Sequence, residues 1–210
     1  MKLDINKHAI LTTFDAEERT KRVSAEFERL GIIPFFLCSV NLKNTCSSIE
    51  GVDTSRCHYS PAQMRGAFGC RFGHFQIVQW AQRHDWDHVF VFENDIAFAP
   101  EFCAGLEEAN RLLPQTFDVC LLGYRFHGQG QNKLTRFNER FLQIKEGEDS
   151  VDIAGAHAYV VNKHHYDYML RTINSKFMPM DVLIMQTKET YLIDKPIVLL
   201  NETSAVSTLL

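Results

Sequence analysis

The chain has 210 residues, of which 45% are hydrophobic, and a formal net charge of -4 at pH 7. This composition is typical of a globular protein and excludes a disordered one, and the acidic balance argues against broad nucleic-acid or anionic-membrane binding. No apolar run approaches the roughly 20 residues of a membrane span, and MKLDINKHAI contains no signal-peptide segment. We therefore expect one domain over residues 1–210, in the cytoplasm, with at most peripheral contact to the inner face of a membrane.

The first forty residues alternate between strand-like and helix-like segments. His8–Phe14 predicts a strand, and Asp15 predicts the cap of a helix whose first turn is acidic. This helix should end at Gly31, a natural C-terminal cap. Ile32–Val40 is a continuous apolar run that predicts a second buried strand. A strand, a helix and a strand in this order predict a parallel pair.

The alternation continues around two polar segments. Strands are predicted at His88–Phe92, Asp118–Tyr124, Ile153–Val161 and Ile193–Leu199, and helices at Gln63–His84, Pro100–Leu113, His164–Ile173 and Pro179–Lys188. Asn41–Pro61 and Arg125–Asp149 are polar and irregular, which is typical of functional or mobile loops. The pattern predicts one α/β domain with a central mixed sheet and two long loops.

The most informative segment is the apolar run VFVFENDIAF, which is interrupted by two carboxylates. Carboxylates are costly inside an apolar strand, so the strand should end at Glu93 and place Asn94 and Asp95 at the carboxyl edge of the sheet. Open α/β sheets bind ligands at that edge. Two carboxylates and an amide suit a hard divalent cation that shares oxygen ligands with a phosphate. A solvated acidic turn is the alternative interpretation.

The six cysteines are scattered and form no CxxC pair. A six-cysteine disulfide framework is typical of much shorter secreted chains, so we expect free thiols in a reducing compartment. A zinc site of Cys46, Cys57, His58 and Cys70 would have a spacing that matches no zinc pattern.

The segments MRGAFGCRFGHFQIVQW and HVFVFENDIAFAPEF carry Gly69-Cys70, Gly73-His74, Trp80 and Glu93-Asn94-Asp95. This set resembles the central signature of glycosyltransferase family 25, in which an apolar strand runs into Glu-Asp-Asp. Weaker similarities follow in the family's order in FDVCLLGYR, GAHAYVVNKHHYDYML and FMPMDVLIM. The chain departs from the family at Asn94, where Asp is usual, and at Gly73, where Ser is common.

The resemblance implies a metal-dependent hexosyltransferase with the A-type glycosyltransferase fold, a single Rossmann-like α/β domain whose mixed sheet is mostly parallel. Such an enzyme would move a sugar, with inversion, from a nucleotide-diphosphate donor to a glycan, a lipid-linked saccharide or another hydroxyl acceptor. We expect a UDP-hexose donor such as UDP-galactose or UDP-glucose, and a role in lipopolysaccharide biosynthesis. Mn²⁺ or Mg²⁺ would stabilise the departing nucleoside diphosphate.

The resemblance also implies roles for individual residues. Asp95 would bind the cation, Asn94 would accept hydrogen bonds from the ribose hydroxyls, and Glu93 would orient the motif or the nucleotide. Asp181 is the candidate general base, and a helix N-cap is its structural alternative. The other candidates for binding the nucleotide sugar are Thr12, Thr13, Arg19, Asp53 and Arg65.

Two histidines are expected close to these residues. His74 should be a buried, hydrogen-bonded helix residue rather than a ligand. His157 lies on a predicted strand from which it would face the acceptor.

Two other classes of protein stay open. A sugar nucleotidyltransferase would show a glycine-rich basic loop after the first strand, and LTTFDAEERTKR contains no glycine. A non-catalytic carbohydrate- or nucleotide-binding relic of the same fold would explain Asn94, whereas the retained carboxylates Glu93, Asp95 and Asp181 argue against that class.

Overall fold

The computed structural model describes residues 2–39, 61–146, 148, 152–175, 180–187 and 189–201. The helices are α1 (Glu17–Arg29), α2 (Pro61–Arg83), α3 (Phe102–Leu112), α4 (Tyr166–Ser175) and α5 (Met180–Ile184), with 3₁₀ turns η1 (Gly130–Lys133) and η2 (Lys163–His165). The strands are β1 (His8–Thr13), β2 (Phe36–Ser39), β3 (His88–Glu93), β4 (Ile96–Phe98), β5 (Val119–Phe126), β6 (Leu134–Arg136), β7 (Phe141–Ile144), β8 (Ile153–Asn162), β9 (Thr190–Ile193) and β10 (Val198–Leu200).

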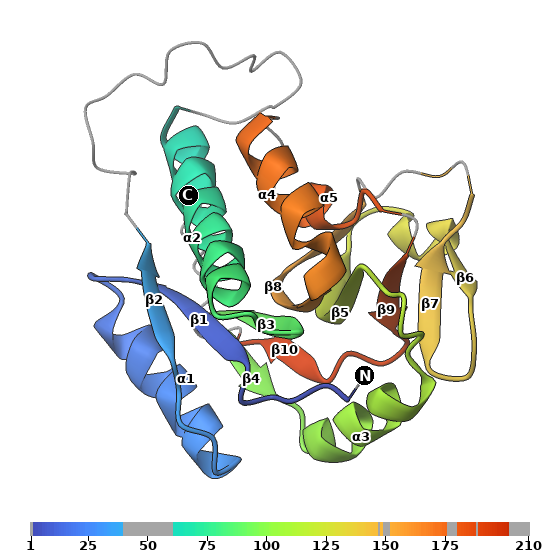
Figure 1. The fold of residues 1–210 in the computed structure, drawn as a ribbon, viewed down its shortest axis with the longest axis horizontal. Coiled ribbons are helices and arrows are strands. Elements are labelled where there is room, and N and C mark those ends of the chain that lie inside the picture. The colour runs from blue at the N-terminus through green and yellow to red at the C-terminus, as the bar shows by residue number, and fades with distance from the viewer. Residues whose placement is uncertain are drawn as a thin grey trace.

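The centre of the molecule is an eight-stranded sheet in the order β2-β1-β3-β8-β5-β9-β7-β6 (Figure 1), and β10 pairs with β4 separately. The pairs β1–β2, β1–β3 and β5–β9 are parallel. The pairs β3–β8, β5–β8, β6–β7 and β7–β9 are antiparallel. The predicted mixed α/β sheet is confirmed, but among the described strands the expected parallel majority is wrong. Part of the reason is that β6 and β7 are joined by a short connection, which permits only antiparallel pairing.

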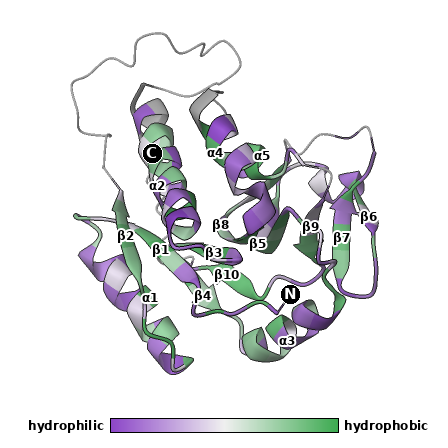
Figure 2. Cartoon of the chain, viewed as in Figure 1, coloured by the Kyte–Doolittle hydropathy of each residue, from purple (hydrophilic) through white to green (hydrophobic). Residues whose placement is uncertain are grey.

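Helices cover both sides of this sheet. α2, α4 and α5 pack against one another, with α2 and α5 also contacting strands, and α1 and α3 lie on the other side (Figure 1). Figure 2 shows β1, β5 and β10 as largely hydrophobic, while α1 alternates between hydrophilic and hydrophobic residues. Among the described residues, no helix combines the length and apolar character needed to cross a membrane.

α1 shows one correct and one wrong prediction about helix ends. The helix begins after Ala16, which makes no side-chain capping bond, so the predicted cap at Asp15 is wrong. The reason is a turn that separates β1 from the helix and delays its start. At the other end Gly31 has a φ of 70°, and the N–H groups of Gly31 and Ile32 donate to carbonyls of the last turn. This is the glycine cap that the sequence predicts.

The C-terminal half differs more from the prediction. The described part of Arg125–Asp149 is not a loop throughout, because it contains η1 and the β6–β7 hairpin, in which Phe141 is fully buried. The single strand predicted at Ile193–Leu199 is the junction of β9 and β10, which belong to different sheets. Pro196 lies between them and has no N–H to donate to a sheet.

The buried histidine His8 gives a prediction about acid stability. Its Nδ1 donates to the Ile5 carbonyl oxygen at 2.8 Å, and its Nε2 accepts the N–H of Phe35 at 3.2 Å. Burial lowers the pKa of His8 below its ordinary value of 6.5. The unfolded chain then binds the proton first, so stability is full above about pH 6.5 and declines as the pH falls towards the pKa of the folded state.

We therefore expect the melting temperature to fall between about pH 7.5 and about pH 5.5. His8→Gln should make this decline shallower because it removes one proton-binding group. His84, which is exposed, serves as the matched position, and His84→Gln should leave the decline as it is. The same slope in the wild type and in His8→Gln would contradict the role of His8.

Candidate active site

The acidic turn lies where the two parallel strands β1 and β3 end. β3 stops at Glu93 as predicted, and Asn94 and Asp95 form the turn into β4. β1 ends beside it at Thr12 and Thr13. The Asp95 carbonyl oxygen accepts the N–H of Asn201 at 2.7 Å, which fixes the turn to the end of β10. The sheet therefore presents the motif at its carboxyl edge, the edge at which open α/β sheets bind ligands.

A chain of hydrogen bonds orients Asn94. Its Nδ2 donates to Thr12 Oγ1 at 2.9 Å, and Thr12 Oγ1 lies 2.8 Å from Thr20 Oγ1 on α1. Because an amide carries its nitrogen and oxygen on opposite sides, the Asn94 carbonyl oxygen points away from Thr12. Next along the chain, Thr13 is half-buried and Phe14 is 93% exposed. The site thus has an oriented acceptor oxygen and an exposed aromatic ring at the end of β1.

Glu93 is held by two side chains of α2. His74 on α2 places Nε2 3.3 Å from Glu93 Oε1, and its Nδ1 lies 2.7 Å from the hydroxyl of Tyr159 on β8. Cys70 Sγ lies 3.6 Å from the same carboxylate oxygen. Burial acts to raise the pKa of Glu93, but the hydrogen bond from His74 and the charges of His74 and His157 hold it below its ordinary value. Glu93 is therefore a carboxylate, and the prediction of a buried, hydrogen-bonded His74 is confirmed.

The pKa of Asp95 is shifted in the opposite direction from that of Glu93. Burial, together with the charge of Glu93, raises the pKa of Asp95 to about 6, against the opposing charges of Arg19 and Arg125. Its Oδ1 is buried and has no hydrogen-bond partner within the described ranges. A buried carboxylate oxygen without a donor costs free energy, and a divalent cation with oxygen ligands would relieve that cost. The residues present fit a cation at Asp95.

Asp181 lies on the neighbouring helix α5, which contacts β8 and α2. It is the second helical residue, so it does not cap α5 from outside, although its Oδ1 accepts the N–H of Val182 at 3.0 Å. Burial raises the pKa of Asp181, the bond from Val182 opposes that change, and the charge of Glu93 adds to it. A half-buried carboxylate with a raised pKa beside the acidic turn has the character of a general base.

The three remaining predicted residues have different positions relative to the acidic turn. Arg19 is half-buried in the first turn of α1, and its charge acts on Asp95, so the structure brings these two residues together. Arg65 is half-buried on α2, nine residues before His74, which is roughly 13 Å along a helix axis, so it lies apart from the cluster at Glu93. Asp53 lies outside the described residues.

Sequence reasoning missed the site roles of Tyr159 and Arg125 and did not foresee the burial of His157. His157 is buried, hydrogen-bonds the backbone of Val198, and has its pKa lowered by burial, with the charge of Glu93 acting in the opposite direction. The signal available in the sequence was the spacing of two, which places His157 and Tyr159 on the same face of β8. Arg125 at the end of β5 carried no such signal.

Two glycines allow the close packing of the site. A Cβ on Gly123 would overlap the His157 ring and the Val198 carbonyl oxygen, and a Cβ on Gly73 would overlap the side chain of Leu11. A larger residue at Gly73 would require the end of the Leu11 side chain to shift, which favours glycine where the resemblance leads one to expect serine.

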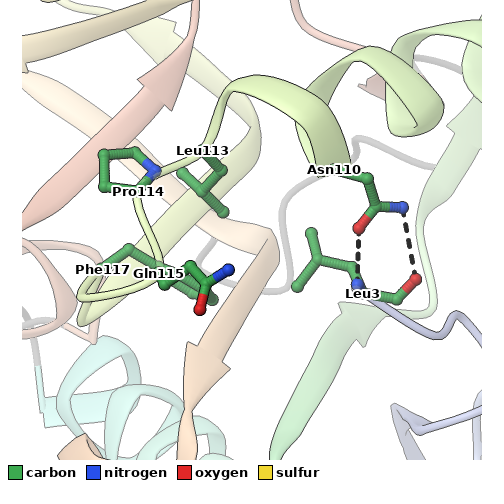
Figure 3. A pocket seen from close by; sticks show the side chains of 6 residues that line it. All are labelled: Leu3, Asn110, Leu113, Pro114, Gln115 and Phe117. Atoms are coloured by element: carbon green, nitrogen blue, oxygen red, sulfur yellow. Dashed lines mark hydrogen bonds between the residues drawn. The ribbon is translucent and has the colours of Figure 1, made fainter. Parts of the chain in front are cut away.

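A small cavity elsewhere in the molecule is too small to bind a substrate. It has a volume of about 10 Å³ and lies where Asn110 of α3 hydrogen-bonds the backbone of Leu3 (Figure 3). A space of this size is about that of one water molecule. Because Leu3 precedes β1, the cavity lies towards the amino end of this strand, whereas the acidic turn lies at the carboxyl edge of the sheet.

Comparison with known proteins gives one family match. The family model of glycosyltransferase family 25, described as an LPS biosynthesis protein, matches residues 12–184. The chain matches no curated protein sequence.

Several solved structures are similar at low sequence identity. The inositol-1-phosphate CTP transferase from T. maritima is 11% identical with a TM-score of 0.46, over 92% of this chain and 69% of that one. A glycosyltransferase involved in the glycosylation of the major capsid of PBCV-1 is 13% identical with a TM-score of 0.39, over 80% of this chain and 67% of that one. A197 from STIV is 13% identical with a TM-score of 0.41, over 88% and 79%.

Proposed function

Since the chain belongs to glycosyltransferase family 25, we propose that it transfers a hexose from a UDP-sugar to a hydroxyl group of a saccharide acceptor, with inversion and with a divalent cation. The observation that carries this proposal is the buried Oδ1 of Asp95, which has no donor among the described residues. It lies in the acidic turn at the carboxyl edge of the sheet, where the mixed α/β architecture of the A-type glycosyltransferase fold would receive a nucleotide.

The donor diphosphate would lie against positive charge. Arg19 from α1 and Arg125 from β5 both act on the Asp95 carboxylate from nearby. Mn²⁺ or Mg²⁺ held by Asp95 would supply further positive charge to the departing UDP. Electrostatic stabilisation of a leaving group by such fixed charges is a large contribution to catalysis.

The acceptor hydroxyl would be activated by Asp181. In an inverting transfer its carboxylate takes the hydroxyl proton while the acceptor oxygen attacks the anomeric carbon opposite the leaving UDP. Burial raises the pKa of Asp181, and the charge of Glu93 adds to this, which makes it a stronger base than an exposed aspartate.

Asn94 gives a prediction about donor recognition. Its Oδ1 would accept a hydrogen bond from a ribose hydroxyl while its Nδ2 donates to Thr12. In Asn94→Asp the Thr12 hydroxyl can turn to donate to the new carboxylate and accept from Thr20, which lies 2.8 Å away. We expect Asn94→Asp to keep or raise donor affinity, measured by calorimetry with UDP and Mn²⁺. A collapse of affinity would mean that the amide donor is required.

A panel of nucleotide sugars tests the proposed function. We expect UDP to be released from a UDP-hexose in the presence of Mn²⁺, and no comparable release from CDP-, GDP- or dTDP-sugars. Release of pyrophosphate from a nucleoside triphosphate and a sugar phosphate would instead identify a nucleotidyltransferase. No turnover and no binding of any donor would contradict the proposal.

A further inference from the structure

We propose that Cys70, His74 and Glu93 form a zinc site that is separate from the cation site at Asp95. The three side chains offer a sulfur, an imidazole nitrogen and a carboxylate oxygen, and these atoms all lie within 4.8 Å of one another. The zinc set considered from the sequence, Cys46, Cys57, His58 and Cys70, shares only Cys70 with this one. Spacing along the sequence does not reveal that Glu93 of β3 lies beside α2.

The distances agree with the geometry of tetrahedral zinc. With Zn–S near 2.3 Å and Zn–N and Zn–O near 2.1 Å, tetrahedral ligands lie roughly 3.6 Å apart for sulfur and oxygen and roughly 3.4 Å apart for nitrogen and oxygen. The structure has 3.6 Å between Cys70 Sγ and Glu93 Oε1 and 3.3 Å between His74 Nε2 and Glu93 Oε1. Two of the three edges of the site are already set to the spacing that the ion requires.

The ligands are held by regular elements and by an outer hydrogen bond. Cys70 and His74 are four residues apart on α2, so they share one face of the helix. The Nδ1 of His74 lies 2.7 Å from the Tyr159 hydroxyl, which fixes the ring with Nε2 towards Glu93. Partners of this kind orient metal-binding histidines. On binding, the Cys70 thiol releases its proton to solvent, and His74 carries its proton on Nδ1, which donates to Tyr159.

One side of the site stays open. The Glu93 side chain is 27% exposed, whereas His74 is completely buried. The charges of Asp95 and Asp181 act on the Cys70 side chain, so both carboxylates lie near it. Three protein ligands with an open fourth position are the arrangement of accessible zinc sites. A water molecule would complete the coordination.

Ligand chemistry separates the two cation sites. A thiolate and an imidazole favour zinc, while a carboxylate surrounded by phosphate and hydroxyl oxygens favours Mn²⁺ or Mg²⁺. Zinc at Cys70, His74 and Glu93 therefore does not depend on whether the protein transfers a sugar.

Cobalt substitution tests the zinc site without any assay of activity. Co²⁺ added to the metal-free full chain should bind with a thiolate-to-cobalt charge-transfer absorption, and Zn²⁺ should remove that absorption. Cys70→Ser should abolish it. Two variants should retain it: Cys103→Ser, because Cys103 is an exposed free thiol, and Asp95→Ala, because the Asp95 carboxylate belongs to the other site.

Glu93→Gln provides a second test in case Cys70→Ser fails to fold. It removes a ligand but keeps the thiol, so the absorption should remain while the cobalt affinity falls by at least about tenfold. The proposal is overturned if the wild type shows no thiolate absorption, if Cys70→Ser keeps it, or if Glu93→Gln binds cobalt as tightly as the wild type. If the chain transfers no sugar, the panel of nucleotide sugars will show it, and the cobalt-binding results will be unchanged.

Discussion

Asp95→Ala is expected to lower the Mn²⁺-dependent affinity for UDP by more than about 100-fold, since even outer-shell partners of a metal contribute about 10–100-fold. Asp95 is the carboxylate whose buried Oδ1 has no donor among the described residues and whose pKa is raised to about 6, first by burial and then by the charge of Glu93. Removing it takes away an unfavourably buried group, so the melting temperature should stay the same or rise.

Calorimetry with UDP, with and without Mn²⁺, measures this effect. Glu107 lies on the exposed side of α3, so Glu107→Ala is the matched loss of a carboxylate and should change neither affinity nor stability. Affinity of Asp95→Ala equal to that of the wild type would contradict the assignment of the cation to Asp95.

Asp181→Asn is expected to lower the rate of sugar transfer by about 10²–10⁴-fold, the contribution typical of a positioned base. The change keeps the shape of the side chain and an oxygen that accepts the N–H of Val182, so the fold of α5 should be preserved. A base acts in the transfer step and contributes little to donor binding, so UDP affinity should hardly change.

Two measurements separate the chemical role of Asp181 from a structural one. A melting temperature and a UDP affinity equal to those of the wild type, with slow transfer, support the base. Unfolding of Asp181→Asn would show that the carboxylate is needed for α5. Intact transfer would place the base elsewhere. The next residues to change are Asp152, which is ion-paired with Lys133, the exposed Glu139, and Asp149, which lies outside the described residues.

Elements with a local apolar pattern could be predicted from the sequence. β1, α1, α2 and β3 appear close to their expected positions because the periodicity of each segment identifies it without knowledge of its neighbours. β6 and β7 were missed because polar residues dominate that region, and Phe141 is their one fully buried side chain. The division between β9 and β10 depends on pairing with different sheets, which a continuous apolar run does not reveal.

The acidic turn could also be predicted, because it interrupts an apolar strand. Its surroundings could not, because they come from elements far apart in the sequence. His74 and Tyr159 are 85 positions apart in the chain, but the His74 Nδ1 and the Tyr159 hydroxyl lie 2.7 Å apart. The effect of Arg125 on Asp95 likewise requires β5 to lie near β3 in the folded chain.

Thermal unfolding with UDP, with and without Mn²⁺, tests most directly whether Asp95 and its neighbours form a cation-dependent nucleotide site. A ligand at about 100 times its Kd adds about 2.7 kcal/mol of stability. For a domain of this size that is roughly 5–10 °C in melting temperature. We predict this rise only when UDP and Mn²⁺ are both present, and its loss in Asp95→Ala. If no nucleotide raises the melting temperature, with or without the metal, the proposed transfer of a sugar from a nucleotide donor is contradicted. A non-catalytic, carbohydrate-binding relic of the fold would then be the better interpretation.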